Sequence, residues 1–156
     1  MASASERLRE LGITLPHVPA PVAAYVPAVV SGQVVHTSGQ LPFVGGVLPE
    51  AGKVGEGEGL VSPEAARGYA RQAALNALAA VQSVIGSLDR VVRVVKVTGF
   101  VASAAGFAGQ STVVDGASTL VGEIFGERGR HARSSVGVAE LPLGSPVEVE
   151  LSVEFA

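Results

Sequence analysis

Apolar and polar residues alternate strictly along the last stretch of the chain, which predicts a β-strand with one buried face. The apolar members of this alternation are Val147, Val149, Leu151, Val153 and Phe155. A second extended run covers residues 133–138, and residues 141–146 between the two runs contain the proline and glycine residues that turns use. We therefore expect the two runs to form one long hairpin.

Two longer segments repeat apolar residues at helical spacing. The first begins at Ser62, a typical N-cap, and Pro63 and Glu64 follow at positions that favour the start of a helix. Its predicted apolar stripe comprises Tyr69, Ala73, Ala77, Ala80, Val84 and Leu88. The stripe of the second comprises Val113, Ala117, Leu120, Val121 and Ile124. Gly126 follows this second stripe at a position where helices commonly end. The many alanines of the first segment predict close packing on a sheet.

Shorter elements are expected before and between these helices. Residues 3–11 predict a short N-terminal helix that ends at Gly12. Residues 25–30 and 33–40 are expected to pair as a first hairpin. Residues 91–102 form a nearly continuous β-branched run, which we interpret as a central strand covered on both faces.

Residues 44–60 differ from the rest of the chain because they contain six glycines and Pro49. Such a composition predicts a flexible connection without a regular element. The segment follows the strand that ends near Gln40, so it is either a mobile lid beside a site or a slack loop.

The predicted order of elements is two strands, a helix, a strand, a helix and two strands. This order favours an α+β fold in which two helices cover one face of a mixed sheet. The other face would carry valine and alanine beside a few polar residues, and such a surface favours a protein partner. A length of 156 residues with 47% hydrophobic residues suits one domain over residues 1–156, with residues 1–15 as a helical extension.

Composition excludes several classes of function. Cysteine is absent, which excludes disulfides, thiolate catalysis and cysteine-based metal sites. A net charge of −3 argues against a nucleic-acid partner, and the three scattered histidines lack metal-site spacing, so no cofactor is implied. No apolar run approaches the roughly 18 residues of a membrane span, and the N-terminus lacks the pattern of a secretion signal. We therefore expect a cytoplasmic protein without a membrane partner.

One stretch carries a recognisable signature. Residues 132–150 read A-R-S-S-V-G-V-A-E-L-P-L-G-S-P-V-E-V-E. This stretch resembles the C-terminal signature of the YjgF/RidA family of reactive-intermediate deaminases, which is close to A-R-S-x-V-x-V-x-x-L-P-x-x-x-x-V-E-I-E. Three segments earlier in the chain also match the family, and they occur in the family's order: around Tyr25, at residues 37–42 and at residues 94–101.

The resemblance implies a chorismate-mutase-like α+β fold and a homotrimer with clefts between its subunits. It also implies hydrolysis of 2-imino acids, or of their enamine tautomers, to 2-keto acids and ammonia. The expected partners are therefore a small imino or keto acid and further copies of the same chain.

Arg133 is the first candidate for this chemistry. A guanidinium binds a carboxylate through two parallel hydrogen bonds and stays protonated when it is partly desolvated. The resemblance assigns Arg133 to the α-carboxylate of the substrate. The alternative is a structural arginine that pairs with Glu148 or Glu150.

Imine hydrolysis also requires a group that orders a water molecule and moves protons as ammonia leaves. Glu148 matches the catalytic glutamate of the family, whereas Glu150 and Glu154 suit a solvated polar face. In the expected hairpin Glu148 pairs with about Ala139, which leaves Arg133 roughly 20 Å away along the strands. If Arg133 and Glu148 share a site, they should come from different subunits.

The resemblance suggests substrate contacts for five further residues. Tyr25, whose hydroxyl can donate to a carboxylate or a water molecule, is either a site residue or a core tyrosine. Ser38 and Gly39 would offer backbone groups, since glycine permits a close approach. Asp115 lies near the site asparagine of the family but would otherwise belong to the first turn of its helix. Ser135 stands where the family often has a cysteine.

Two other functions remain open. A non-catalytic binding module would use the same arginine to sense a carboxylated metabolite. An endoribonuclease, an activity also ascribed to the family, is supported neither by the charge nor by a pair of histidines. Ser135, Gly137 and the longer segment 44–60 depart from the family pattern, and they bear on substrate identity more than on reaction type.

Overall fold

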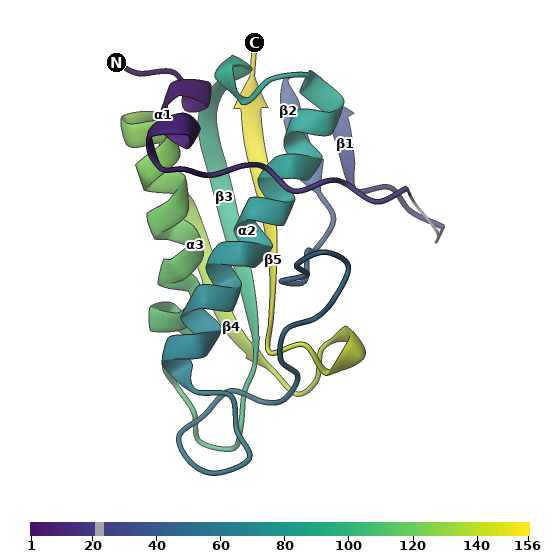
Figure 1. Cartoon of the computed structure of the whole chain (residues 1–156), viewed down its shortest axis with the longest axis vertical. Coiled ribbons are helices and arrows are strands. Elements are labelled where there is room, and N and C mark those ends of the chain that lie inside the picture. Colours follow the sequence, from purple (N-terminus) through teal and green to yellow (C-terminus); the bar gives the residue numbers. More distant parts are fainter. Residues whose placement is uncertain (21–23) are drawn as a thin grey trace.

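A computed structural model describes residues 1–20 and 24–156 and shows one layer of helices on one face of a five-stranded sheet (Figure 1). The strands are β1 (Ala28–Ser31), β2 (Val34–Thr37), β3 (Val91–Ala102), β4 (Ala132–Val138) and β5 (Val147–Phe155). They lie in the order β1-β2-β5-β3-β4. Only β3 and β4 pair in parallel, whereas the other neighbours are antiparallel. The predicted α+β fold with a mixed sheet is confirmed.

The predicted C-terminal hairpin is wrong, because β3 lies between β4 and β5. Helix α3 (Gln110–Phe125) connects β3 to β4, and a parallel pair requires such a crossover. The segment between β4 and β5 contains a short 3₁₀ helix at Pro142–Gly144, in which Leu143 has a φ of 59°. Alternation of side chains identified both strands correctly, but it carries no information about which strand each one joins.

Strand β3 lies inside the sheet with a partner on each side, but the middle strand is β5, and helices cover only one face of β3. Val94, Val97 and Val101 are buried beneath the helices, whereas 45% of Val92 and 40% of Val95 stay exposed on the other face. Irregularities in the pairing with β5 lie beside these two exposed valines. The expectation that both faces are covered is therefore wrong for a single chain. This uncovered side is called the open sheet face below.

Helix α2 (Pro63–Ile85) begins as predicted, with the Ser62 hydroxyl accepting a hydrogen bond from the Ala65 amide at 3.1 Å. Helix α3 approaches α2 closely at Gly116 of α3, where a Cβ atom would lie 2.0 Å from the Arg67 carbonyl oxygen. Most of the predicted stripe is buried, but 41% of Val84 is exposed, so that assignment is wrong. Helix α3 ends at Gly126, whose φ of 58° favours glycine.

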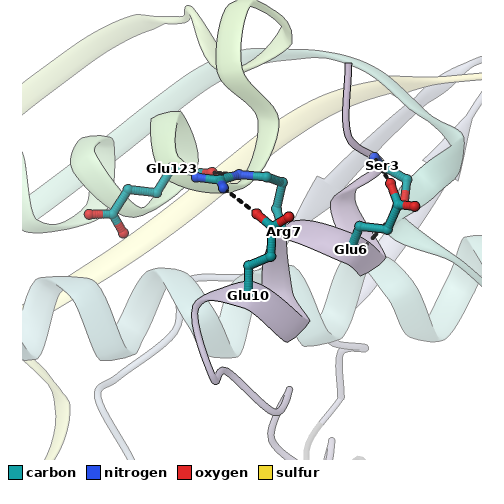
Figure 2. Close-up of polar contacts among 5 residues, drawn as sticks. All are labelled: Ser3, Glu6, Arg7, Glu10 and Glu123. Carbon is teal, nitrogen blue, oxygen red and sulfur yellow. Dashed lines mark hydrogen bonds and ion pairs between the residues drawn. The ribbon is translucent and has the colours of Figure 1, made fainter.

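The N-terminal helix α1 (Ala4–Glu10) packs against the main body of the fold. Figure 2 shows its capping box, in which Ser3 and Glu6 satisfy each other's backbone amides. Arg7 donates from Nε to the Glu123 carbonyl at 3.0 Å and pairs with Glu10 (Figure 2). Ala4 and Leu8 of α1 are buried in the hydrophobic core.

Residues 44–60 form neither a helix nor a strand, yet the segment is less free than its composition predicted. Val54 is fully buried, donates to the Ala102 carbonyl at 2.7 Å and accepts from the Ala104 amide at 2.9 Å. Val61 is buried as well. The expected flexibility is therefore wrong at Val54, because a glycine-rich composition does not reveal single buried residues. Whether the segment acts as a lid or is a slack loop stays open.

Two further 3₁₀ helices, at Leu88–Arg90 and Gly126–Gly129, lead into β3 and away from α3. Within the described ranges, no helix has both the length and the apolar character that crossing a membrane requires.

Candidate functional site

The predicted site residues fall into two groups on opposite faces of the sheet. Arg133 lies beside Val97 in the pairing of β4 with β3, and Val97 faces the helices. Glu148 lies beside Phe100 and alternates with buried Val147 and Val149, so its side chain points to the other face. The structure thus separates the two residues that the sequence assigned to one reaction.

The first group, called the arginine cluster, is built on one side of α3. Ser111, Asp115 and Ser118 are spaced four and three residues apart, which places them on one helix face beside β4. Arg133 Nη1 donates to Asp115 Oδ1 at 2.7 Å and to Ser118 Oγ at 3.1 Å, and Nη2 donates to the Ser111 carbonyl at 3.3 Å. Its side chain remains 22% exposed.

These contacts correct two sequence interpretations. Arg133 pairs with Asp115, not with Glu148 or Glu150. Asp115 lies in the second turn of α3, since the helix begins at Gln110. A guanidinium has five N–H donors, and the three contacts leave Nε–H and one Nη2 proton without a partner among the described residues. Those two donors are available to a ligand carboxylate.

Ser135 lies on the same side of β4, two residues beyond Arg133. Its hydroxyl is buried and has no hydrogen-bond partner in the described part of the chain. Such a group carries an energetic cost unless a ligand or water satisfies it. Gly137, the next residue on this face, leaves space for Gln110, because a Cβ atom there would lie 2.8 Å from Gln110 Nε2.

Neither Ser118 nor His131 is among the site residues predicted above. The structure joins the two through a hydrogen bond of 2.8 Å between Ser118 Oγ and His131 Nε2. The signal that could have identified Ser118 is its place three residues after Asp115 on the predicted helix. Its contact with His131 depends on where β4 meets α3, which sequence spacing does not reveal.

The second group surrounds Glu148 and is called the glutamate groove. The groove has a volume of about 430 Å³, and its lining includes Tyr25, Gly39, Gln40 and Glu148. Tyr25 is 66% exposed, so the alternative of a core tyrosine is wrong. A groove of this size and partly polar lining suits a small organic ligand.

Gly39 lies directly against the side chain of Glu148. A Cβ atom there would lie 2.5 Å from Oε1 of Glu148. The pairing between β2 and β5 is interrupted here, since the Leu151 amide donates to the Thr37 hydroxyl while Gln40 exchanges two backbone hydrogen bonds with Val149. The interruption lets the glutamate side chain approach the backbone at Gly39, and a contact between Gly39 and a substrate stays a prediction.

Ser38 stabilises the segment that carries Tyr25. Its hydroxyl donates to the Val26 carbonyl at 2.6 Å and its amide to the Pro27 carbonyl at 2.8 Å. Both groups are therefore engaged within the chain, and a contact between Ser38 and a substrate remains a prediction.

The environment of Glu148 favours its protonated form. Partial burial raises the pKa of the Glu148 carboxyl, and the neighbouring charge of Glu150 adds to this effect. A carboxyl with a raised pKa accepts and returns a proton more readily near neutral pH than an ordinary glutamate does.

Replacing Glu148 with glutamine is expected to raise the Tm at pH 7. Because folding raises the pKa of this carboxyl, its ionisation costs stability once the pH exceeds the unfolded pKa, and the full cost is reached above the folded pKa. Below the unfolded pKa of about 4.3, both states hold the proton and the gain should vanish. Thermal melts at acid and neutral pH, with exposed Glu56→Gln as the control, measure this difference. An equal gain in Tm at both pH values would contradict a raised pKa of the Glu148 carboxyl.

No group of three or more metal-ligating side chains comes together among the described residues. The predicted site residues come together in two places, the arginine cluster and the glutamate groove.

Comparison with known proteins agrees with this architecture. Residues 5–155 match the family described as "YjgF/chorismate_mutase-like, putative endoribonuclease". Protein TCP17 of Trypanosoma cruzi is 47% identical over 151 residues, which cover 95% of this chain and 91% of TCP17. The crystal structure of protein Atu1372 from Agrobacterium tumefaciens has a TM-score of 0.87 at 40% identity and covers 99% and 94% of the two chains. A "putative endoribonuclease" from Shewanella oneidensis MR-1 has a TM-score of 0.92 at 32% identity, over 99% of this chain and all of the other.

The chain therefore belongs to the YjgF/chorismate mutase-like family. The resemblance stated from the signature at residues 132–150 is confirmed, as is the fold that it implied.

Proposed function

We propose that the chain hydrolyses 2-imino acids, or their enamine tautomers, to 2-keto acids and ammonia in a homotrimer. Arg133 of one subunit and Glu148 of the next complete each site. The observation that carries this proposal is the division of the site residues into two incomplete halves. One half holds a guanidinium with unused donors, and the other holds a carboxyl whose pKa burial raises.

The open sheet face supports assembly. It exposes Val92, Val95 and Val136, each at least 40% exposed, beside the polar side chains of β5. Burying such valines against a second copy is favourable in water. A neighbouring subunit on this face can also bring its own edge strand, and with it Arg133, towards Glu148.

The reaction requires little covalent chemistry from the protein. The two free donors of Arg133 would hold the substrate carboxylate and fix the adjacent iminium carbon. Glu148 would take a proton from water as the oxygen bonds to that carbon and the C=N bond becomes single. It would then return this proton to nitrogen, and as the C–N bond breaks the proton of the new hydroxyl passes to the leaving ammonia, so that iminium and water become a ketone and an ammonium ion.

The direct test generates 2-iminobutanoate from threonine with a dehydratase. Semicarbazide then traps the imine that has not been hydrolysed, and the amount of trapped imine is measured. We expect the purified protein to lower the amount of trapped imine in proportion to its concentration. Binding of 2-oxobutanoate without any acceleration would support the non-catalytic binding module instead. Cleavage of RNA under the same conditions, absent in Arg133→Ala, would favour the endoribonuclease that the names of some relatives suggest.

A second cavity of about 460 Å³ adjoins the glutamate groove on the side of α2. The two share Val18, Pro19, Gln40 and Phe43, and the second is also lined by Ala79. This largely apolar extension suits the side chain of an imino acid larger than 2-iminopropanoate. We therefore expect this extension, which Gly45 and Gly46 also line, to decide substrate size.

Replacing Ala79 with leucine should reduce hydrolysis of the imine of leucine several-fold relative to 2-iminopropanoate, since the added methyl groups fill the extension. Rates for the two imines, produced by an amino-acid oxidase and a serine dehydratase, measure the ratio. Val84→Leu, on the exposed side of the same helix, is the matched control. An unchanged ratio in a folded Ala79→Leu protein would rule out the extension as a substrate subsite.

A further inference from the structure

A directed hydrogen-bond chain leads from the start of β4 to Arg133. Nδ1 of His131 lies 2.6 Å from the Gly129 carbonyl oxygen, which can only accept, so Nδ1 carries the proton. In a neutral imidazole Nε2 is then an acceptor, and it receives the Ser118 hydroxyl proton at 2.8 Å. The Ser118 oxygen keeps its lone pairs for Nη1 of Arg133 at 3.1 Å.

Ser118 needs such a partner because it lies inside a helix. A serine within a helix commonly turns its hydroxyl to the carbonyl four residues earlier, here that of Val114. Among the described residues, the hydroxyl instead contacts only His131 and Arg133. His131 thus accounts for the orientation of the hydroxyl away from its own helix.

The orientation of Ser118 affects the guanidinium directly. Ser118 and Asp115 together occupy both protons of Nη1, which fixes the plane of the group. Nε–H and the remaining Nη2 proton have no partner among the described residues, so fixing the plane also fixes the directions in which these two donors can meet a ligand. If the hydroxyl turned back to its helix, Nη1 would lose one of two partners and the guanidinium would sample other orientations.

We propose that His131 is a positioning residue for Arg133, acting through Ser118 to hold the guanidinium ready for the substrate carboxylate. This rests on the proposed function of Arg133. The competing explanation is purely structural: His131 would only tie the start of β4 to the preceding 3₁₀ helix through its contact with Gly129.

Two amide substitutions separate these roles because each retains one end of the imidazole. In His131→Gln, the amide oxygen can reach the place of Nε2 and accept from Ser118. In His131→Asn, the shorter amide can replace Nδ1 and donate to Gly129, but it does not reach Ser118. The first variant therefore keeps the link to Arg133, and the second keeps only the local tie.

The experiment measures kcat and KM for 2-iminobutanoate and the Kd of the product 2-oxobutanoate for each variant. His131→Asn should raise KM and Kd about fivefold with little change in kcat, as expected when one supporting hydrogen bond is lost. His131→Gln should stay within about twofold of the parent protein. Ser118→Ala should match His131→Asn, and the double variant should be no worse, because both remove the same link.

Exposed Thr119→Ala, one residue further along α3, is the matched control and should bind 2-oxobutanoate like the parent. Equal effects of His131→Asn and His131→Gln, or additive effects of the His131→Asn and Ser118→Ala changes, would overturn the positioning role. Ser118→Ala tests the same link if the histidine variants fold poorly. If Arg133→Ala leaves the Kd unchanged, the proposed function itself fails, which is a separate outcome.

Discussion

Replacing Arg133 with alanine should lower kcat/KM for imine hydrolysis by at least about a hundredfold, because two charge-assisted hydrogen bonds to the substrate carboxylate are lost. The fold should survive, since Arg133 lies on the edge strand β4 and 47% of the side chain of its partner Asp115 is exposed to water. Lysine should restore little activity, because a single ammonium cannot reproduce the paired donors. Steady-state kinetics, with circular dichroism and light scattering for folding and mass, provide the measurement.

Asp115→Asn is a useful companion to this experiment. It keeps a hydrogen-bond acceptor for Nη1 and removes only the charge, so it should retain far more activity than Arg133→Ala. Full activity of a folded Arg133→Ala protein would remove the arginine from the mechanism. Loss of folding in that variant would instead support a structural role for the pair with Asp115.

Co-expression of two inactive variants, Arg133→Ala and Glu148→Gln, should restore activity. In a closed ring where each site takes Arg133 from one subunit and Glu148 from the next, random mixing leaves about one site in four with both native residues. Each variant alone should be inactive, and differently tagged chains allow the mixed trimer to be isolated. Among the isolated mixed trimers one site in three has both native residues, so the turnover of that fraction measures the recovery.

The opposing outcomes are equally definite. If Arg133 and Glu148 of the same chain formed the site, mixing would restore nothing, because every chain would carry one defect. A particle that is monomeric by light scattering and still active would also exclude a site between subunits. The double variant Arg133→Ala/Glu148→Gln, co-expressed with itself, is the inactive control.

Much of the local structure could be predicted because it depends on neighbours in sequence. The cap at Ser62 and the end at Gly126 set the limits of two helices, and the alternation at residues 147–155 identified the last strand. The arginine of the signature was likewise recognisable, because few apolar strands carry a guanidinium. In each case the information lies within about one turn of helix or one strand.

Predictions that depended on distant contacts were less successful. Segment 44–60, which was predicted to be flexible, contains the buried Val54. Backbone hydrogen bonds to β3 and to the loop after it hold this residue, and no local pattern indicates them. Asp115 was related to a site asparagine, but its contact with Arg133 follows from α3 crossing beside β4. Such contacts arise only when segments far apart in sequence pack together.

The amino-acid sequence by itself determined which residues form helices and strands, and which charged residues stand out from an apolar setting. Periodicity and capping are local, so they survive without knowledge of the fold. Only the tertiary structure decided that β3 lies between β4 and β5, which places Arg133 and Glu148 on opposite faces of one sheet. The physical reason is that the pairing of strands depends on the crossover helix and on packing in the shared core. Both involve contacts between segments that are far apart in sequence.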